Sequence, residues 1–261
     1  MNDYKDTPSF FNNEEVLKKY LGDTSYYTAL RAAIIKLVNL IKPKKVVELG
    51  SATGSTTIML AKKFKTIKFI GTDIREDVVD IAKKTAKSQN LENLSFAVSD
   101  MCDFVKNAID ADFVFMLYSF HHILDPLDLK KQFIVDAFNN MKKGSFLCVA
   151  ETFIPEEIDN SKLDIDRILD LWSTRSKEGY ASTYWGSLEG LSADKLRLAK
   201  ETAEYCSKNE SLAGSLVAKR QDEYLVKRSW VSEQGKKAGF SVVINEPVNA
   251  LGDGVVLLKK E

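Results

Sequence analysis

The stretch that decides the fold is Lys45-Val46-Val47-Glu48-Leu49-Gly50-Ser51-Ala52-Thr53-Gly54. A short, mostly apolar run, Lys45–Leu49, passes directly into a turn of small residues that ends at Gly54. Such a run is typical of a buried strand, and glycine lets the backbone approach a ligand without a Cβ clash. A helix is expected over residues 55–64, and the free N–H groups of its first turn would favour a bound ligand. The stretch therefore predicts a strand–turn–helix unit with a ligand site at the turn.

Strands and helices alternate on both sides of this unit. Further strands are expected at Lys68–Asp73, Leu94–Val98, Asp112–Leu117, Ser145–Thr152, Phe240–Ile244 and Gly254–Leu258. Apolar residues recur at helical spacing over Thr28–Ile41, Val78–Thr85 and Leu129–Met141, and a short helix is expected near 229–238. This order predicts an α/β fold, a Rossmann-like, seven-stranded, mostly parallel sheet with helices on both faces.

The alternation breaks after Pro155. Residues 156–228 are almost purely helical in pattern and rich in charge, and they include an amphipathic segment over Leu191–Cys206. We therefore expect three parts. They are an N-terminal lid segment (1–27), a cofactor-binding domain (28–155 and 229–261), and a helical insertion after strand five that forms the acceptor pocket (156–228).

Composition excludes several classes of protein. Lys+Arg and Asp+Glu both count 37 and the pI is about 6.8, so no basic excess favours nucleic acid as a partner. The three cysteines, Cys102, Cys148 and Cys206, form no CxxC pair, so we expect neither a disulfide framework nor a metal site. The N-terminus lacks the apolar run of a signal peptide, and no apolar stretch is long enough for a membrane span. These features predict a cytoplasmic protein without a membrane partner.

Two acidic residues follow successive strands. Asp73 ends the second strand, where a carboxylate can accept both hydroxyls of a ribose, and Asp100 follows the third, where it can take the exocyclic amine of an adenine. Each alone reads as a solvated loop residue, but together they favour a nucleoside ligand. A dinucleotide dehydrogenase is the alternative, although the turn has glycines spaced as GxxxG, not GxGxxG. The glycines could also serve strand–helix packing alone.

These residues resemble the class I S-adenosylmethionine-dependent methyltransferase family. Glu48–Gly54 resembles its E/DxGxGxG motif, with Ala52 in place of the middle glycine, a change that we expect to be tolerated at negative φ. Asp112–His122 resembles the fourth-strand motif, and Lys236–Phe240 resembles the family's AGF entry into strand six. The resemblance covers residues 27–154 and 229–258, and it implies S-adenosylmethionine as cofactor and S-adenosylhomocysteine as product.

The resemblance also implies which residues hold the cofactor. Glu48 would meet the methionyl ammonium through water, and Arg31, assisted by Tyr27, would hold the carboxylate, although Arg31 could equally be an exposed helix residue. The residues expected around the cofactor are Tyr27, Arg31, Glu48, Gly50, Ser51, Ala52, Gly54, Asp73, Ile74, Asp100, Met101 and Tyr118.

Methyl transfer needs little more than alignment of the acceptor with the electrophilic methyl. His122 and Glu151 end strands four and five, where they could remove a proton from the acceptor; His121 is the weaker candidate, and both histidines could be structural. Asp164 and Asp166 could hold a cationic group. These four, His122, Glu151, Asp164 and Asp166, are the expected catalytic residues. Aromatic residues that could line the acceptor pocket, or belong to the core, are Phe10, Phe11, Phe120, Trp172, Tyr180, Tyr184 and Trp185.

Chain size, the aromatic N-terminal segment and the helical insertion together resemble the N-methyltransferases that modify the N-terminal arginine of plantazolicin-type azole peptides. We therefore expect N-methylation of a small molecule or modified peptide by a monomer or homodimer. The alternatives are an O- or N-methyltransferase of another secondary metabolite and a cofactor-binding scaffold without transfer activity. A nucleic-acid methyltransferase is disfavoured because the net charge is zero and no [D/N]PPY-like motif is present.

Overall fold

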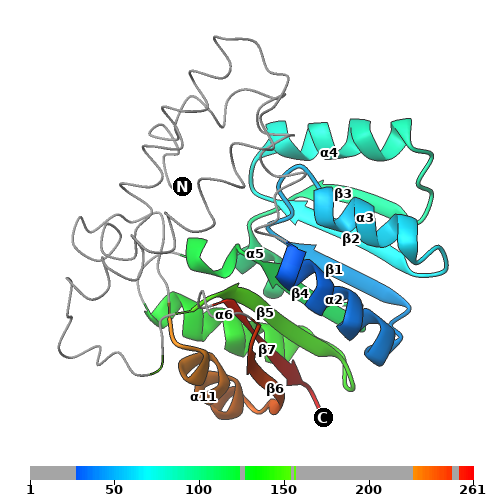
Figure 1. The fold of residues 1–261 in the computed structure, drawn as a ribbon. Coiled ribbons are helices and arrows are strands. Elements are labelled where there is room, and N and C mark those ends of the chain that lie inside the picture. The colour runs from blue at the N-terminus through cyan, green and yellow to red at the C-terminus, as the bar shows by residue number, and fades with distance from the viewer. Residues whose placement is uncertain (1–27, 124–126, 154–155, 157–225, 249–252) are drawn as a thin grey trace, which may run out of the picture. The chain divides into compact units, whose positions relative to one another are not determined.

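The computed structural model describes residues 28–123, 127–153, 156, 226–248 and 253–261 (Figure 1). Seven strands make up one sheet: β1 (Lys45–Leu49), β2 (Lys68–Asp73), β3 (Leu94–Val98), β4 (Phe113–Leu117), β5 (Phe146–Thr152), β6 (Ser241–Pro247) and β7 (Asp253–Lys259). The helices of this part of the chain are α2 (Thr28–Ile41), α3 (Ser55–Lys63), α4 (Glu76–Ser88), α5 (Met101–Val105), the 3₁₀ turn η4 (Phe120–His122), α6 (Leu127–Asn140) and α11 (Arg228–Ala238).

The strand order is β3-β2-β1-β4-β5-β7-β6. Strands β1 to β5 pair in parallel, and β7 lies antiparallel between β5 and β6. The predicted seven-stranded, mostly parallel α/β sheet is therefore confirmed. The sequence pattern did not indicate the short elements α5 and η4, because neither is long enough to show a helical period.

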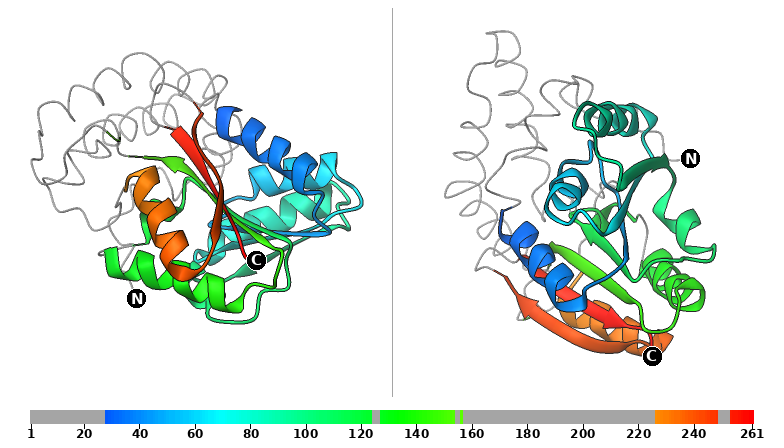
Figure 2. Two further views of the ribbon diagram at one scale, coloured as in Figure 1. Left: turned by 90° about the horizontal axis from the view of Figure 1, so that it is seen from below. Right: turned by 90° about the vertical axis from the view of Figure 1, so that its right-hand side faces the viewer.

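Helices lie on both sides of the sheet (Figure 2). Alternate residues of the central strands point to opposite faces, which is why these strands are apolar at almost every position. On one face, Val47, Val114 and Val149 belong to one buried cluster together with side chains of α5, α6 and α11. Their neighbours Val46, Phe113 and Cys148 are equally buried, so both faces of the sheet are covered.

The inner face of α6 differs from the expected one. Phe133, Ala137 and Met141 are buried as the spacing predicts, but Leu129 is 51% exposed and Lys130 takes the inward position with 0% exposure. The prediction that Leu129 belongs to the buried face of this helix was therefore wrong, because the next residue, Lys130, occupies that position. Among the described helices, none is long and apolar enough to cross a membrane.

The chain runs outward from β1 toward β3 in one direction and from β4 toward β6 in the other. Ligands of open α/β sheets bind at such a switch point, beyond the carboxyl ends of the strands. Here the ends of β1 and β4 are tied together, because the Ser119 hydroxyl donates to the Leu49 carbonyl at 2.7 Å. A Cβ on Gly50 would lie 2.4 Å from the Ser119 Cβ, so this close approach requires glycine.

Candidate functional site

The loop between β1 and α3 is anchored to the neighbouring strand. The N–H groups of Gly50 and Ser51 both donate to the Thr72 carbonyl of β2, at 2.8 and 2.7 Å. Gly54 has φ +77° as the N-cap of α3, and a Cβ there would lie 2.4 Å from the Phe96 ring. The two motif glycines therefore do serve tight packing, and this packing shapes the loop that faces the switch point.

Ala52, in place of the family's middle glycine, has φ +46°. Alanine is expected to be tolerated at this position if φ is negative, and the structure does not meet that condition. An L-residue in the left-handed region costs about 1–2 kcal/mol, because its Cβ crowds the carbonyl oxygen. The loop holds the strained conformation because the Ala52 N–H donates to Asp73 Oδ2 at 2.8 Å.

Asp73 stands at the end of β2, directly beside the loop. Its Oδ2 accepts from Ala52 and its Oδ1 accepts from the Arg75 N–H at 3.0 Å. Burial raises the pKa of Asp73, and these two backbone donors act in the opposite direction. Each carboxylate oxygen has two acceptor sites, so one on each remains for the paired hydroxyls of a ribose. The next residue, Ile74, is 43% exposed, as a contact to a ligand would require.

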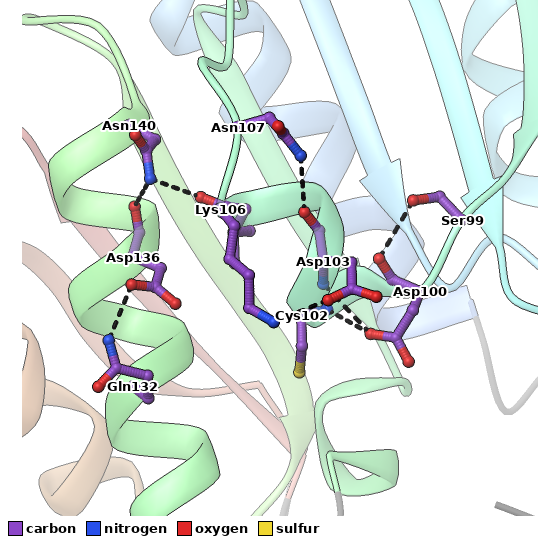
Figure 3. Close-up of polar contacts among 10 residues, drawn as sticks. Ser99, Asp100, Cys102, Asp103, Lys106, Asn107, Gln132, Asp136 and Asn140 are labelled. Atoms are coloured by element: carbon purple, nitrogen blue, oxygen red, sulfur yellow. Dashed lines mark hydrogen bonds and ion pairs between the residues drawn. The ribbon is translucent and has the colours of Figure 1, made fainter. Parts of the chain in front are cut away.

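Asp100 is the N-cap of α5 (Figure 3). Its Oδ1 accepts from the N–H groups of Cys102 and Asp103, at 2.7 and 3.4 Å. Neither contact uses Oδ2, and the Met101 N–H has no hydrogen-bond partner among the described residues. A carboxylate oxygen beside an unpaired N–H matches the donor and acceptor that the edge of an adenine presents.

Glu48 is 3% exposed and accepts from the Thr57 hydroxyl. Burial raises the pKa of Glu48 to about 7, although the Thr57 hydrogen bond and the charge of Arg31 lower it. Arg31 lies against the first turn of α3, where its guanidinium donates to Ser55 Oγ at 2.7 Å and to Thr56 Oγ1 at 3.0 Å. The Glu48 carboxylate and the Arg31 guanidinium therefore both lie near the loop. An amino-acid group bound there would need a negative partner for its ammonium and a positive partner for its carboxylate.

One buried polar atom belongs to the loop itself. Within the described ranges, Ser51 Oγ is buried without a hydrogen-bond partner, and Ser51 is 6% exposed. Buried hydroxyls are nearly always paired, with protein groups or with ordered water, and this one lies against Gly71 of β2, where an added Cβ would come within 2.8 Å of it. The polar groups around this loop fit S-adenosylmethionine, for which Glu48 would meet the ammonium, Asp73 the ribose and Asp100 the adenine.

A second cluster follows β4 and β5. His121 Nδ1 lies 2.9 Å from Glu151 Oε2, and the His121 N–H donates to the same oxygen at 3.3 Å. His122 Nε2 lies 3.0 Å from His121 Nε2. The structure thus joins both histidines to Glu151, with His121, the weaker candidate from the sequence, in the middle.

Two aromatic residues after β4, Tyr118 and Phe120, differ in their surroundings. Tyr118 directly follows β4 with φ +52°, a strained position at the switch point. Phe120 is 1% exposed and packs edge-on against Phe133 at 5.9 Å, so it lies in the core cluster. The other predicted site residues lie outside the described residues: Phe10, Phe11, Tyr27, Asp164, Asp166, Trp172, Tyr180, Tyr184 and Trp185.

Sequence reasoning missed Ser119, Thr57 and Lys130. Lys130 shares the helical spacing of Phe133 and Ala137, and a lysine at a core position was the available signal. Ser119 and Thr57 gave no signal, since a hydroxyl near a strand end or in a helix is common. In the described part of the chain, no group of three or more His, Cys, Asp or Glu side chains could hold a metal ion.

The fold and this loop define a class I S-adenosylmethionine-dependent methyltransferase domain, with S-adenosylmethionine as its methyl donor. Residues 41–188 match the family described as a methyltransferase domain, and the chain belongs to that family. A carboxy-S-adenosyl-L-methionine synthase from Campylobacter fetus is 29% identical over 161 residues, which span 60% of this chain and 64% of the relative.

Two solved structures share the fold. A Pyrococcus horikoshii protein superposes with a TM-score of 0.58 at 16% identity, covering 99% of this chain and 98% of that one. Human N-acetylserotonin methyltransferase in complex with the cofactor superposes with a TM-score of 0.54 at 15% identity, covering 99% of this chain and 62% of the human protein. The chain thus spans less than two thirds of the Campylobacter and human proteins.

Proposed function

We propose that this protein transfers the methyl group of S-adenosylmethionine to a nitrogen atom of a small molecule or modified peptide. The observation that supports the transfer is the arrangement of Glu48, Asp73 and Asp100 at the carboxyl ends of β1, β2 and β3, around one strained loop. When bound, the cofactor supplies a methyl made electrophilic by the sulfonium. The chain's own part is to hold the donor in place and to present the acceptor in line, which contributes roughly 7–11 kcal/mol to lowering the barrier.

The cluster of His121, His122 and Glu151 supplies the second part of the reaction. The two histidines follow β4, the strand that pairs with β1. The hydrogen bond from the Ser119 hydroxyl to the Leu49 carbonyl holds the ends of β4 and β1 together. An amine must lose its proton before it can attack, and an imidazole is suited to take that proton near neutral pH.

The preference for nitrogen rests on charge. The sulfonium repels a protonated amine, so carboxylates near the acceptor must offset that charge. Asp164 and Asp166 are proposed for this role from their place in the sequence. Glu151 is 2% exposed and bonded to His121, so its charge would act on the acceptor through the histidines. We further propose the N-terminal arginine of a plantazolicin-type azole peptide as the acceptor, with Trp172, Tyr184 and Trp185 beside the heterocycles.

The test is transfer of a labelled methyl group to a panel of amines, arginine derivatives and azole peptides, with the product located by mass spectrometry. Asp164→Ala and Asp166→Ala should each lower turnover without changing cofactor affinity. Asp128→Ala, on the exposed side of α6, is the matched control and should behave like the wild type. Wild-type rates in both acidic variants and in Glu151→Gln would rule out the acidic acceptor site and with it the amine.

An oxygen acceptor is the second candidate, and the contact between His121 and Glu151 favours it, because a hydroxyl nucleophile needs a base. Such a substrate would show no need for Asp164 or Asp166. A protein that binds the cofactor but transfers no label to any acceptor would instead be a scaffold.

A further inference from the structure

Ser119 contacts both halves of the site. It lies between the end of β4 and the turn η4, and it is buried. Its hydroxyl donates to the Leu49 carbonyl at the end of β1, and its own carbonyl accepts from the His122 N–H at 3.1 Å. One residue is thus bonded through its side chain to the strand that leads into the loop between β1 and α3, and through its backbone to the turn that carries the histidines.

Ser119 also packs directly against the loop between β1 and α3. A Cβ added to Gly50 would lie 2.4 Å from Ser119 Cβ and 2.8 Å from Ser119 Oγ. On its other side, Gly50 donates its N–H to the Thr72 carbonyl of β2 at 2.8 Å. Packed interiors are hardly compressible and transmit displacements. A ligand that fixes this loop therefore also fixes the surface against which Ser119 packs.

The backbone is strained where the chain leaves β4. Tyr118 has φ +52°, and its N–H donates to the Ala150 carbonyl of β5 at 3.0 Å. Lys42 and Asn90, which also have positive φ, follow the ends of α2 and α4, where a left-handed residue is common. Tyr118 follows a strand, so the capping of a helix does not account for its conformation. Strain of this kind is found at functional sites, and the next residue, Ser119, is the one that packs against the loop.

The turn η4 connects Ser119 to the second cluster. The Ile123 N–H donates to the Phe120 carbonyl at 3.2 Å, one residue further along than the bond from His122 to Ser119. Between them, the His121 N–H donates to Glu151 Oε2, and His121 Nδ1 lies 2.9 Å from the same oxygen. Bonds between residues three apart hold a 3₁₀ turn together. A shift of Ser119 would therefore move the whole turn relative to Glu151.

We propose that Ser119 is a positioning residue, which couples binding of S-adenosylmethionine at the loop to the position of the two histidines of η4. The bound cofactor holds Leu49 and Gly50 in place, and Ser119 then holds the turn in one position. The role of the histidines at the acceptor rests on the proposed methyl transfer, whereas the coupling itself does not. Coupling of two sites is reciprocal, so an acceptor bound at the histidines raises cofactor affinity by the same factor by which the cofactor raises acceptor affinity.

S-adenosylhomocysteine alone tests the coupling, because the sequence contains only two histidines and both belong to η4. In ¹⁵N-labelled protein, saturating S-adenosylhomocysteine should shift both imidazole signals. It should also slow the exchange of the His122 and Ile123 N–H groups by about fivefold or more, as is typical of coupled sites. Ser119→Ala removes the bond to the Leu49 carbonyl and keeps the Cβ, whereas Ser119→Gly removes both. The response should therefore shrink in Ser119→Ala and vanish in Ser119→Gly.

Ser145→Ala is the matched control. Ser145 is buried and its hydroxyl donates to the Lys142 carbonyl, but it directly precedes β5, at the opposite edge of the sheet from the loop. This variant loses a buried hydrogen bond, as Ser119→Ala does, and should respond to S-adenosylhomocysteine like the wild type. A full response in Ser119→Gly would overturn the proposal, as would wild-type η4 signals that do not change with S-adenosylhomocysteine.

The transfer rate gives a second, separate measurement, with any acceptor that the labelled-methyl assay identifies. Ser119→Ala should lower kcat by on the order of 10- to 100-fold, because misplacement of the turn spoils the alignment of the acceptor. The Kd of S-adenosylhomocysteine without acceptor should change little, and the acceptor should no longer lower it. Equal kcat in Ser119→Ala and Ser145→Ala would overturn the proposal. If the η4 signals respond through Ser119 but no acceptor is methylated, the proposed function fails and the coupling stands.

Discussion

The backbone N–H of Ala52 donates to Oδ2 of Asp73 at 2.8 Å, across 21 positions of sequence. This bond joins the loop after β1 to the acid at the end of β2, so the carboxylate proposed to hold the ribose also shapes the loop. Changes at Asp73 should therefore affect loop and ligand together.

Asp73→Ala should weaken binding of S-adenosylmethionine and S-adenosylhomocysteine by about tenfold or more, because it removes charge-assisted hydrogen bonds to the ribose. Calorimetry measures this directly, and NAD should not bind to either protein. Asp80→Ala, on the exposed face of α4, is the control. Unchanged affinity in Asp73→Ala would remove Asp73 from the site.

Ala52→Gly should stabilise the protein. Relief of the strain at positive φ should raise the free energy of unfolding by about 1–2 kcal/mol. The greater conformational freedom of glycine in the unfolded chain should lower it by about 0.4–1 kcal/mol. The free energy of unfolding, measured with urea, should thus rise by roughly 0.5–1 kcal/mol. Ala32→Gly, on the exposed face of α2, should instead lower it by about 1 kcal/mol. Equal losses in both variants would show that φ at Ala52 carries no strain.

Glu48 should couple cofactor binding to pH. Its pKa is about 7 in the folded chain, and a nearby methionyl ammonium would favour the ionised form. Cofactor affinity should therefore rise from about pH 5 to about pH 7 and then level off, with protons released on binding. Calorimetry in buffers of different ionisation enthalpy counts those protons. Glu48→Gln should bind with an affinity that does not change over this range.

The same pKa of Glu48 predicts a stability change in the absence of cofactor. The folded chain holds this proton more tightly than the unfolded chain, whose pKa is 4.5. The stability gained from the protonated form is therefore lost as the pH rises from about 4.5 to about 7. The free energy of unfolding of Glu48→Gln, measured with urea, should not show this decrease with pH. If it depends on pH in the same way as that of the wild type, the prediction is wrong.

Lys130 should make stability depend on pH in the opposite direction. Burial lowers the pKa of Lys130 to about 7, against the charge of Glu151, which raises it. The folded chain binds this proton less tightly than the unfolded chain, so the free energy of unfolding should rise with pH above 7. Between pH 7 and pH 9 the gain should be about 2 kcal/mol.

Lys130→Met should remove most of that gain, and Lys131→Met, at the exposed neighbouring position, should keep it. Thermal and urea unfolding across the range separate the two variants. If Lys130→Met and the wild type respond to pH alike, the buried lysine is charged throughout and the predicted titration is wrong.

The sequence by itself determined the succession of the strands and the longer helices along the chain, and with it the place of the loop between β1 and α3. Strand β1 and helix α2 have the predicted bounds. The pattern of apolar residues that indicates a buried strand or an amphipathic helix lies within one short stretch of sequence. Asp73 and Asp100 could be proposed as ligand contacts for the same reason: Asp73 ends β2, and Asp100 comes two residues after β3.

Only the tertiary structure decided how the second cluster is connected. Glu151 contacts His121, 30 positions away, and His121 belongs to the 3₁₀ turn η4 that follows β4. The positive φ of Ala52 follows from a bond to β2, and the inward Lys130 from the carbonyl and ring that it contacts. Local patterns report the period of a helix or strand, whereas these features depend on groups that only folding brings together.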